Sequence, residues 1–108
     1  MKYYIKTHTI KGRNRLQEAI VREVEDWNGT LVKDELAKDA FINTMRGIVE
    51  RYNIKYPLCR PCRLSVYDDG VTIATEMVED TFVNMYVYKV TSVFDGVRNL
   101  VEEEGGGL

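Results

Sequence analysis

The spacing of the apolar residues changes once along the chain, and this change limits the folds that the sequence can adopt. Between residues 15 and 52, apolar side chains recur every three or four residues, which is typical of amphipathic helices. From residue 63 to residue 91 they alternate with polar side chains, which is typical of half-buried strands. A chain with this pattern favours an α+β fold in which helices pack on one face of an antiparallel sheet.

The local signals predict the element order β-α-α-β-β-β-α. The expected elements are a strand over residues 2–10, helices over 15–27 and 35–52, a hairpin over 63–77, a strand over 82–91 and a short helix over 93–104. Asn14 and Asp34 are suited to be the N-caps of the first two helices. Asp68, Asp69 and Gly70 supply the turn of the hairpin.

The length of 108 residues allows one hydrophobic core, so we expect a single domain over residues 1–104 and a flexible, glycine-rich tail over residues 105–108. No run of 18 apolar residues occurs, and the first ten residues lack the pattern of a secretion signal. The sequence therefore predicts a cytoplasmic protein that does not bind membranes and whose cysteines are reduced.

Charge is distributed unevenly along the chain. Residues 1–63 carry 13 Lys or Arg and 8 Asp or Glu, whereas residues 64–108 carry 2 and 9, which gives +5 and −7 and a net charge of −2. Two halves that pack together would offset each other's charge. If instead the acidic half is exposed at one edge, it favours a partner with a basic surface.

Both cysteines of the chain lie in one Cys-x-x-Cys motif, at Cys59 and Cys62. The motif follows a predicted helix and leads into a predicted strand, which is the reverse of the order in thioredoxin-like redox sites. Nearby Arg60 and Arg63 could still favour a thiolate. A redox pair is therefore one alternative, and a structural turn with two small, partly buried thiols is the simpler interpretation.

A zinc site would need four ligands, usually Cys or His. The chain has one histidine, His8, so Cys59 and Cys62 would need either a second copy of the pair in a homodimer or His8 with a carboxylate. The sequence thus predicts no cofactor, with zinc bound by the two cysteines as the alternative.

Basic residues surround the turn after the first predicted strand, at Lys6, Lys11, Arg13 and Arg15. Together with nearby tyrosines they could hold a phosphate backbone and stack bases. The sequence pI of about 5.4 argues against a nucleic-acid-binding domain. Nucleic-acid binding is therefore kept as an alternative function.

The chain holds seven tyrosines, a residue type that is enriched at interfaces. No phosphate-binding loop, nucleophile elbow or metalloprotease motif occurs, so we expect no enzymatic activity. We expect a small, non-catalytic binding protein, such as an inhibitor or regulator of the kind that phages and mobile elements encode, which binds a basic protein partner or a second copy of itself. The expected binding residues are tyrosines of one sheet face and carboxylates of an acidic edge: Tyr67, Asp68, Asp69, Glu76, Glu79, Asp80, Tyr86 and Tyr88.

Overall fold

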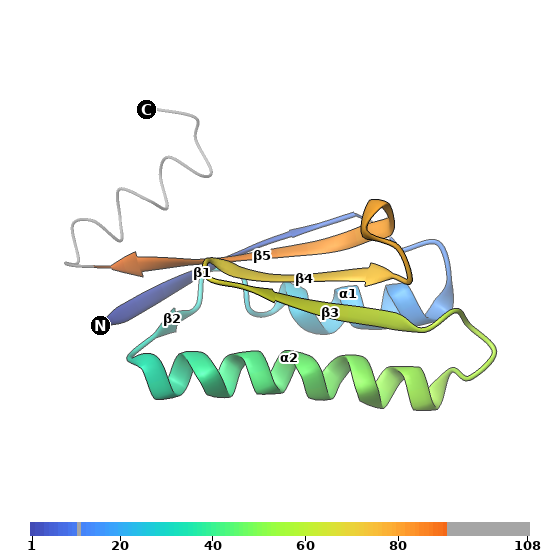
Figure 1. Ribbon diagram of the computed structural model, residues 1–108, viewed down its shortest axis with the longest axis horizontal. Coiled ribbons are helices and arrows are strands. Elements are labelled where there is room, and N and C mark those ends of the chain that lie inside the picture. The colour runs from blue at the N-terminus through green and yellow to red at the C-terminus, as the bar shows by residue number, and fades with distance from the viewer. Residues whose placement is uncertain (11, 91–108) are drawn as a thin grey trace.

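The computed structural model describes residues 1–10 and 12–90. Five strands of this part of the chain form one antiparallel sheet in the order β2-β1-β5-β4-β3, and two helices cover one of its faces (Figure 1). The elements are β1 (Lys2–Thr9), α1 (Arg15–Glu25), β2 (Leu31–Val32), α2 (Glu35–Lys55), β3 (Cys62–Tyr67), β4 (Gly70–Thr75), the 3-10 helix η1 (Val78–Asp80) and β5 (Thr81–Val90). The expected α+β fold, with helices on one face of an antiparallel sheet, is confirmed.

Within the described residues, the element order differs from the expectation by two short additions, β2 and η1. The two-residue strand β2 was not predicted; it pairs with β1, where Tyr3 lies opposite Val32. Two residues are too few to show the alternation by which strands are found in a sequence. The predicted helix over 93–104 and the tail over 105–108 lie outside the described residues.

Both predicted N-caps are confirmed. The Asn14 side chain accepts a hydrogen bond of 2.8 Å from the Gln17 backbone N–H, and the Gln17 side chain accepts one of 3.2 Å from the Asn14 N–H. This reciprocal pair is a capping box. Asp34 accepts a hydrogen bond of 2.8 Å from the Ala37 N–H at the start of α2. Local side-chain chemistry therefore fixes where both helices begin.

The core lies between the helices and one face of the sheet. The strand alternation predicts this face correctly, because Ile5 of β1 and Val83 and Met85 of β5 are at most 1% exposed against the helices. Strict alternation along β5 would place Phe82 on the opposite face with Tyr86 and Tyr88, but Phe82 is 4% exposed and belongs to the core. The pairing of β4 with β5 is irregular there, since Ile73 lies opposite Val83 but Ala74 lies opposite Thr81. The extra residue, Phe82, turns into the core.

Trp27, the single tryptophan, lies just after α1 and packs on the helical layer. Its ring centroid is 5.2 Å from that of Phe41 on α2, and it is half-buried at the border of the core. None of the helices in the described residues is long and apolar enough to cross a membrane.

Gly47 lies inside α2, and apart from its chain neighbours and the backbone of its own helix, no atom lies within 4 Å of the position that a Cβ would take there. Glycine in a helix costs conformational entropy relative to alanine. We therefore expect Gly47→Ala to raise the free energy of unfolding by about 0.5 to 1 kcal/mol, as measured by urea denaturation. Gly29→Ala is the matched control, because φ at Gly29 is +82° and an alanine there should lower stability. A loss of stability in Gly47→Ala would contradict the prediction.

Candidate functional site

The sheet face opposite the helices, here called the outer face, carries a row of rings. Tyr4 stacks on Tyr88 with ring centroids 5.9 Å apart, and Tyr88 stacks on Tyr86 at 6.1 Å. His8 and Tyr86 pack in a T-shaped arrangement with ring centroids 5.7 Å apart. This order follows from the register of β1 and β5, in which Tyr4 lies opposite Tyr88 and Lys6 lies opposite Tyr86.

The outer face has a closed part and an open part. Tyr4 and Lys6 are only 3% and 7% exposed, although the helices lie on the other side of the sheet. Tyr86 and Tyr67 are 39% and 51% exposed. The open part, which consists of the outward side chains of β3 and β4 together with Tyr86, is therefore the region available to a ligand.

One cross-strand row places two of the predicted binding residues on either side of a glycine. Tyr67 of β3 lies opposite Gly70 of β4, and Gly70 lies opposite Tyr86 of β5. Two strand spacings separate the tyrosines, which is about 10 Å. Because Gly70 has no side chain, the surface between the two tyrosines is recessed.

A hollow of about 230 Å³ adjoins this row on the open part. Three small side chains, Ser65, Thr72 and Ala74, form adjacent positions on β3 and β4 and leave space between longer neighbours. The complete lining is Arg63, Ser65, Tyr67, Thr72, Ala74, Glu76, Met77, Thr81 and Asn84. The hollow offers hydroxyl, amide and apolar surface to a ligand.

Glu76 at the end of this hollow has a strained backbone. Its φ of +59° is uncommon for a residue other than glycine. The Arg63 side chain donates a hydrogen bond of 3.0 Å to the Glu76 carbonyl oxygen, and Arg60 lies 3.9 Å from the Glu76 carboxylate. Strained residues are often held in place at binding sites, so this backbone supports the assignment of the hollow as a site.

The acidic residues predicted to form one edge lie in two clusters. Asp68 and Asp69 form the exposed turn between β3 and β4, whereas Glu76, Glu79 and Asp80 lie in the connection between β4 and β5. The length of β4 separates the clusters by about 17 Å. A partner that covers the open part would meet negative charge at both ends of the hairpin.

The two cysteines lie in different surroundings. Both are free thiols; Cys59 is half-buried in the loop before β3, and Cys62 is 3% exposed and faces the core. Burial raises the pKa of the Cys62 thiol to about 11, and the hydrogen bond with Thr75 lowers it only in part. Cys62 is therefore a neutral thiol at physiological pH, which does not favour redox or metal chemistry there.

The arrangement around the cysteines also bears on the two zinc alternatives. His8 is on the outer face of the sheet, whereas Cys62 faces the core on the other side. Within residues 1–10 and 12–90, no three Cys, His, Asp or Glu side chains lie close enough together to hold a metal ion. A site shared between two copies would have to draw Cys62 out of the core.

The described residues of the predicted basic turn do not form one basic surface. Lys6 is buried on the outer face of β1, Lys11 lies outside the described residues, and Arg13 and Arg15 are exposed beside the start of α1. Arg13 shares a hollow of about 320 Å³ with Arg60, Glu79 and Asp80, so charges of both signs meet there. This mixture does not favour a phosphate backbone as the ligand.

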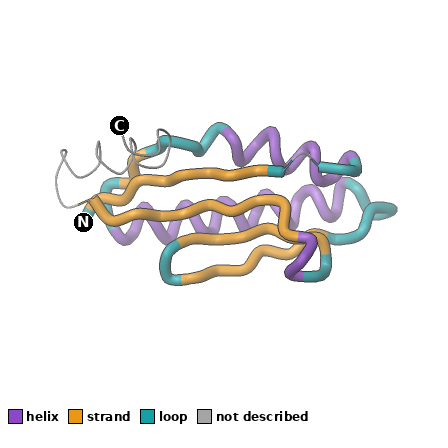
Figure 2. The backbone as a smooth tube through the Cα atoms, turned by 90° about the horizontal axis from the view of Figure 1, so that it is seen from above, coloured by secondary structure: helices purple, strands orange, loops and turns teal. Residues whose placement is uncertain are grey.

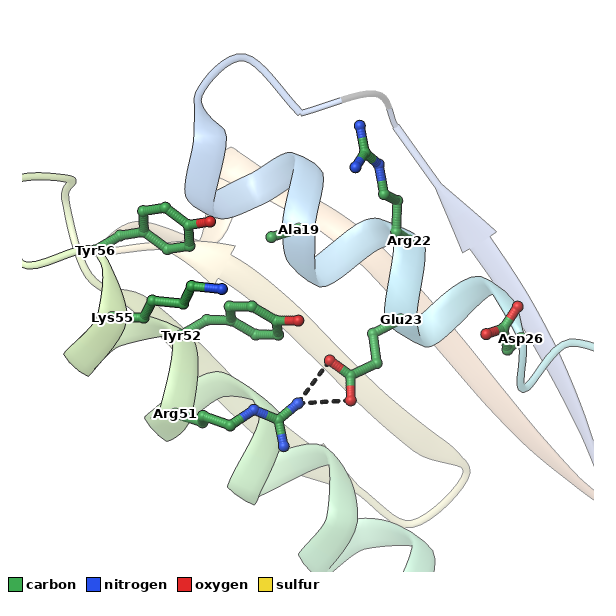
Figure 3. Close-up of a pocket in the computed structure, with 8 residues that line it drawn as sticks. All are labelled: Ala19, Arg22, Glu23, Asp26, Arg51, Tyr52, Lys55 and Tyr56. Atoms are coloured by element: carbon green, nitrogen blue, oxygen red, sulfur yellow. Dashed lines mark hydrogen bonds and ion pairs between the residues drawn. The ribbon is translucent and has the colours of Figure 1, made fainter.

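A groove of about 600 Å³ lies between α1 and α2 (Figure 3). It was not predicted from the sequence. Its lining is Ala19, Arg22, Glu23, Asp26, Arg51, Tyr52, Lys55 and Tyr56. The spacing of Tyr52, Lys55 and Tyr56 on one helix face is the signal that could have revealed it.

The polar groups that line this groove are largely engaged with one another. Arg51 donates hydrogen bonds of 2.6 Å to both carboxylate oxygens of Glu23, and this contact lowers the pKa of Glu23. Lys55 lies 5.7 Å and 5.6 Å from the ring centroids of Tyr52 and Tyr56. The open part of the outer face is therefore the stronger candidate site.

Comparisons of the chain with protein family models, with curated proteins and with solved structures found no match. Function is therefore inferred from the chemistry of the surface.

Proposed function

We propose that the chain is a non-catalytic binding protein that holds a protein partner against the open part of its outer sheet face. The observation that carries this proposal is the pair of exposed tyrosines, Tyr67 and Tyr86, beside a hollow of about 230 Å³. Exposed aromatic side chains next to a concave surface are typical anchors of protein interfaces. Tyr88 is half-buried on the same face, and its ring stacks on that of Tyr86.

The lining of the hollow supports recognition rather than catalysis. Its ionisable side chains are Arg63, Tyr67 and Glu76, and Arg63 is held by the carbonyl oxygen of Glu76. The hydroxyl groups of Ser65 and Thr72 stand on strands without a histidine or cysteine among the lining residues to act as a base. Such a surface binds a partner by shape and hydrogen bonds.

The acidic clusters at the two ends of the hairpin set the chemistry of the partner. Asp68 and Asp69 at one end, and Glu79 and Asp80 at the other, favour a partner with basic groups about 17 Å apart. A basic side chain between them could also enter the hollow beside Glu76. Charge of this kind raises the rate of association and makes it sensitive to salt.

We expect Tyr67→Ala combined with Tyr86→Ala to weaken partner binding about thirty-fold, because each replacement removes a ring at the centre of the interface. The partner is first isolated with a photo-reactive residue at Met77, which is 54% exposed beside the hollow. Affinities of the purified partner for the parent chain and for the double variant are then compared by titration at two salt concentrations.

Two controls make this experiment specific to the outer face. A photo-reactive residue at Leu36, which is 80% exposed on α2, should not form the same adduct. Tyr56→Ala in the helix groove should leave the affinity unchanged. Equal cross-linking from Met77 and Leu36, or equal affinity of the parent and the double variant, would contradict the proposed function.

A further inference from the structure

Strand β3 is the last strand of the sheet in the described residues, and it forms one border of the sheet in the view from above (Figure 2). The Cys62 N–H donates a hydrogen bond of 2.8 Å to the Asn53 side-chain oxygen, and the Asn53 amide donates one of 2.9 Å to the Cys62 carbonyl oxygen. The backbone groups of Cys62 therefore point away from β4. Because these directions alternate along a strand, the N–H and C=O groups of Leu64 and Val66 also point outward.

These four outward groups form an open edge. Within the described residues, no hydrogen bond to them is found, while Ser65 and its neighbours pair with β4. Natural edge strands are usually protected by charged side chains, especially lysine, or by proline or a bulge. β3 contains neither lysine nor proline, its one charged side chain, Arg63, is bonded to Glu76, and Val66 and Tyr67 are 44% and 51% exposed. The edge is therefore open to a further strand.

The side chains of β3 are complementary to those of a second β3 placed antiparallel around a two-fold axis at Ser65. In this register Leu64 lies opposite Val66 of the second copy, which joins two apolar side chains on the helix side of the sheet. On the outer face Ser65 lies opposite its own copy, and Arg63, which is already bonded to the Glu76 carbonyl oxygen, lies opposite Tyr67.

The charges at the two ends of the strand are complementary in the same register. Arg60 and Arg63 lie at the start of β3, and the acidic turn of Asp68 and Asp69 follows its end. Antiparallel pairing brings the basic end of each copy to the acidic turn of the other. The side chain of Arg60 is 72% exposed, and its contact with the Glu76 carboxylate is long, at 3.9 Å, so it can turn toward the acidic turn of the other copy.

Neighbouring registers fit less well. An axis at Leu64 would require the backbone groups of Cys62, which Asn53 already occupies. An axis at Val66 would place Leu64 opposite Asp68, an apolar side chain against a carboxylate. The axis at Ser65 uses all four open backbone groups on each copy.

From this edge we infer that the chain self-associates through β3, and that two copies form a dimer with one continuous sheet. The two hollows then adjoin across the seam, and the dimer presents a doubled outer face. This inference goes beyond the proposed function, because partner binding by one copy does not require it. The paired strands are short, so we expect a weak dimer that dissociates on dilution.

The test reverses the charges near either end of β3 in the full chain. Dimerisation is measured by sedimentation and native mass spectrometry without any partner protein. One variant carries Asp68→Arg and Asp69→Arg, and the other carries Arg60→Glu and Arg63→Glu. The parent should dimerise, each variant alone should dimerise at least tenfold more weakly, and an equimolar mixture should recover the heterodimer. A parent that stays monomeric, or variants that each dimerise like the parent, would overturn the inference.

A second pair of variants tests the backbone contact itself. Val66→Pro removes an outward N–H that no strand in the described part of the chain uses, so the fold should tolerate it while the dimer is lost. Val66→Thr keeps the N–H and should still dimerise. If Val66→Pro abolishes binding of a partner protein while the parent is monomeric, the edge pairs with a different chain, and self-association is excluded.

Discussion

Gly70→Ala is expected to lower the free energy of unfolding by about 3 kcal/mol or more. A Cβ at this position would lie 2.0 Å from the Met85 carbonyl oxygen, which is fixed in the β4–β5 pair. The φ of +157° at Gly70 is also rare for residues with a side chain. The hairpin can relieve the clash only if β4 moves away from β5, which breaks ladder hydrogen bonds.

Urea denaturation of the parent and of Gly70→Ala measures this loss directly. Thr72→Ala is the matched control, because Thr72 lies two residues further along the same strand and points to the same face. The control should change stability by less than about 1 kcal/mol. A similarly small effect in Gly70→Ala would show that the hairpin can shift without cost.

Stability should fall in alkaline solution because of Cys62. Its thiol has a pKa of about 11 in the folded chain, against an ordinary value of 9.0, chiefly because of burial. The thiol therefore loses its proton at a lower pH in the unfolded chain than in the folded chain. The contribution of the protonated thiol to the free energy of unfolding is complete below about pH 9 and is lost as the pH rises through 11. The loss amounts to about 2 kcal/mol between pH 8 and pH 11.

The comparison with Cys62→Ala isolates this contribution. Lysine and tyrosine side chains also titrate in this range, but they are common to both proteins and cancel in the difference. The free energy of unfolding of the parent should drop by about 2 kcal/mol more than that of the variant between the two pH values. Parallel curves for the two proteins would mean that Cys62 ionises normally in the fold.

The two helices, and the face of the sheet that packs on them, were predictable because their signals are local. Asn14 and Asp34 act through hydrogen bonds to residues three positions away, and the alternation in β5 needs no knowledge of its neighbours. The same reasoning could not detect β2, which is too short for alternation, or the burial of Lys6, since lysine is ordinarily exposed.

The candidate site was predictable only in part. Tyr67 and Tyr86 were expected to share a face, and the strand register brings them into one row. The hollow depends on Ser65, Thr72 and Ala74 lying side by side, which follows from the register of two strands and not from either strand alone. The acidic residues are close in sequence, but an intervening straight strand holds them apart.

The position of Trp27 has a practical consequence for optical measurements. Its indole ring lies against Phe41 on the helical side, with the sheet between it and the outer face. Tryptophan emission should therefore follow the separation of α1 from α2 and change little when a ligand docks on the tyrosines. A single sample can thus report unfolding by tryptophan emission and occupancy of the open part by a tyrosine-sensitive signal, as two independent channels.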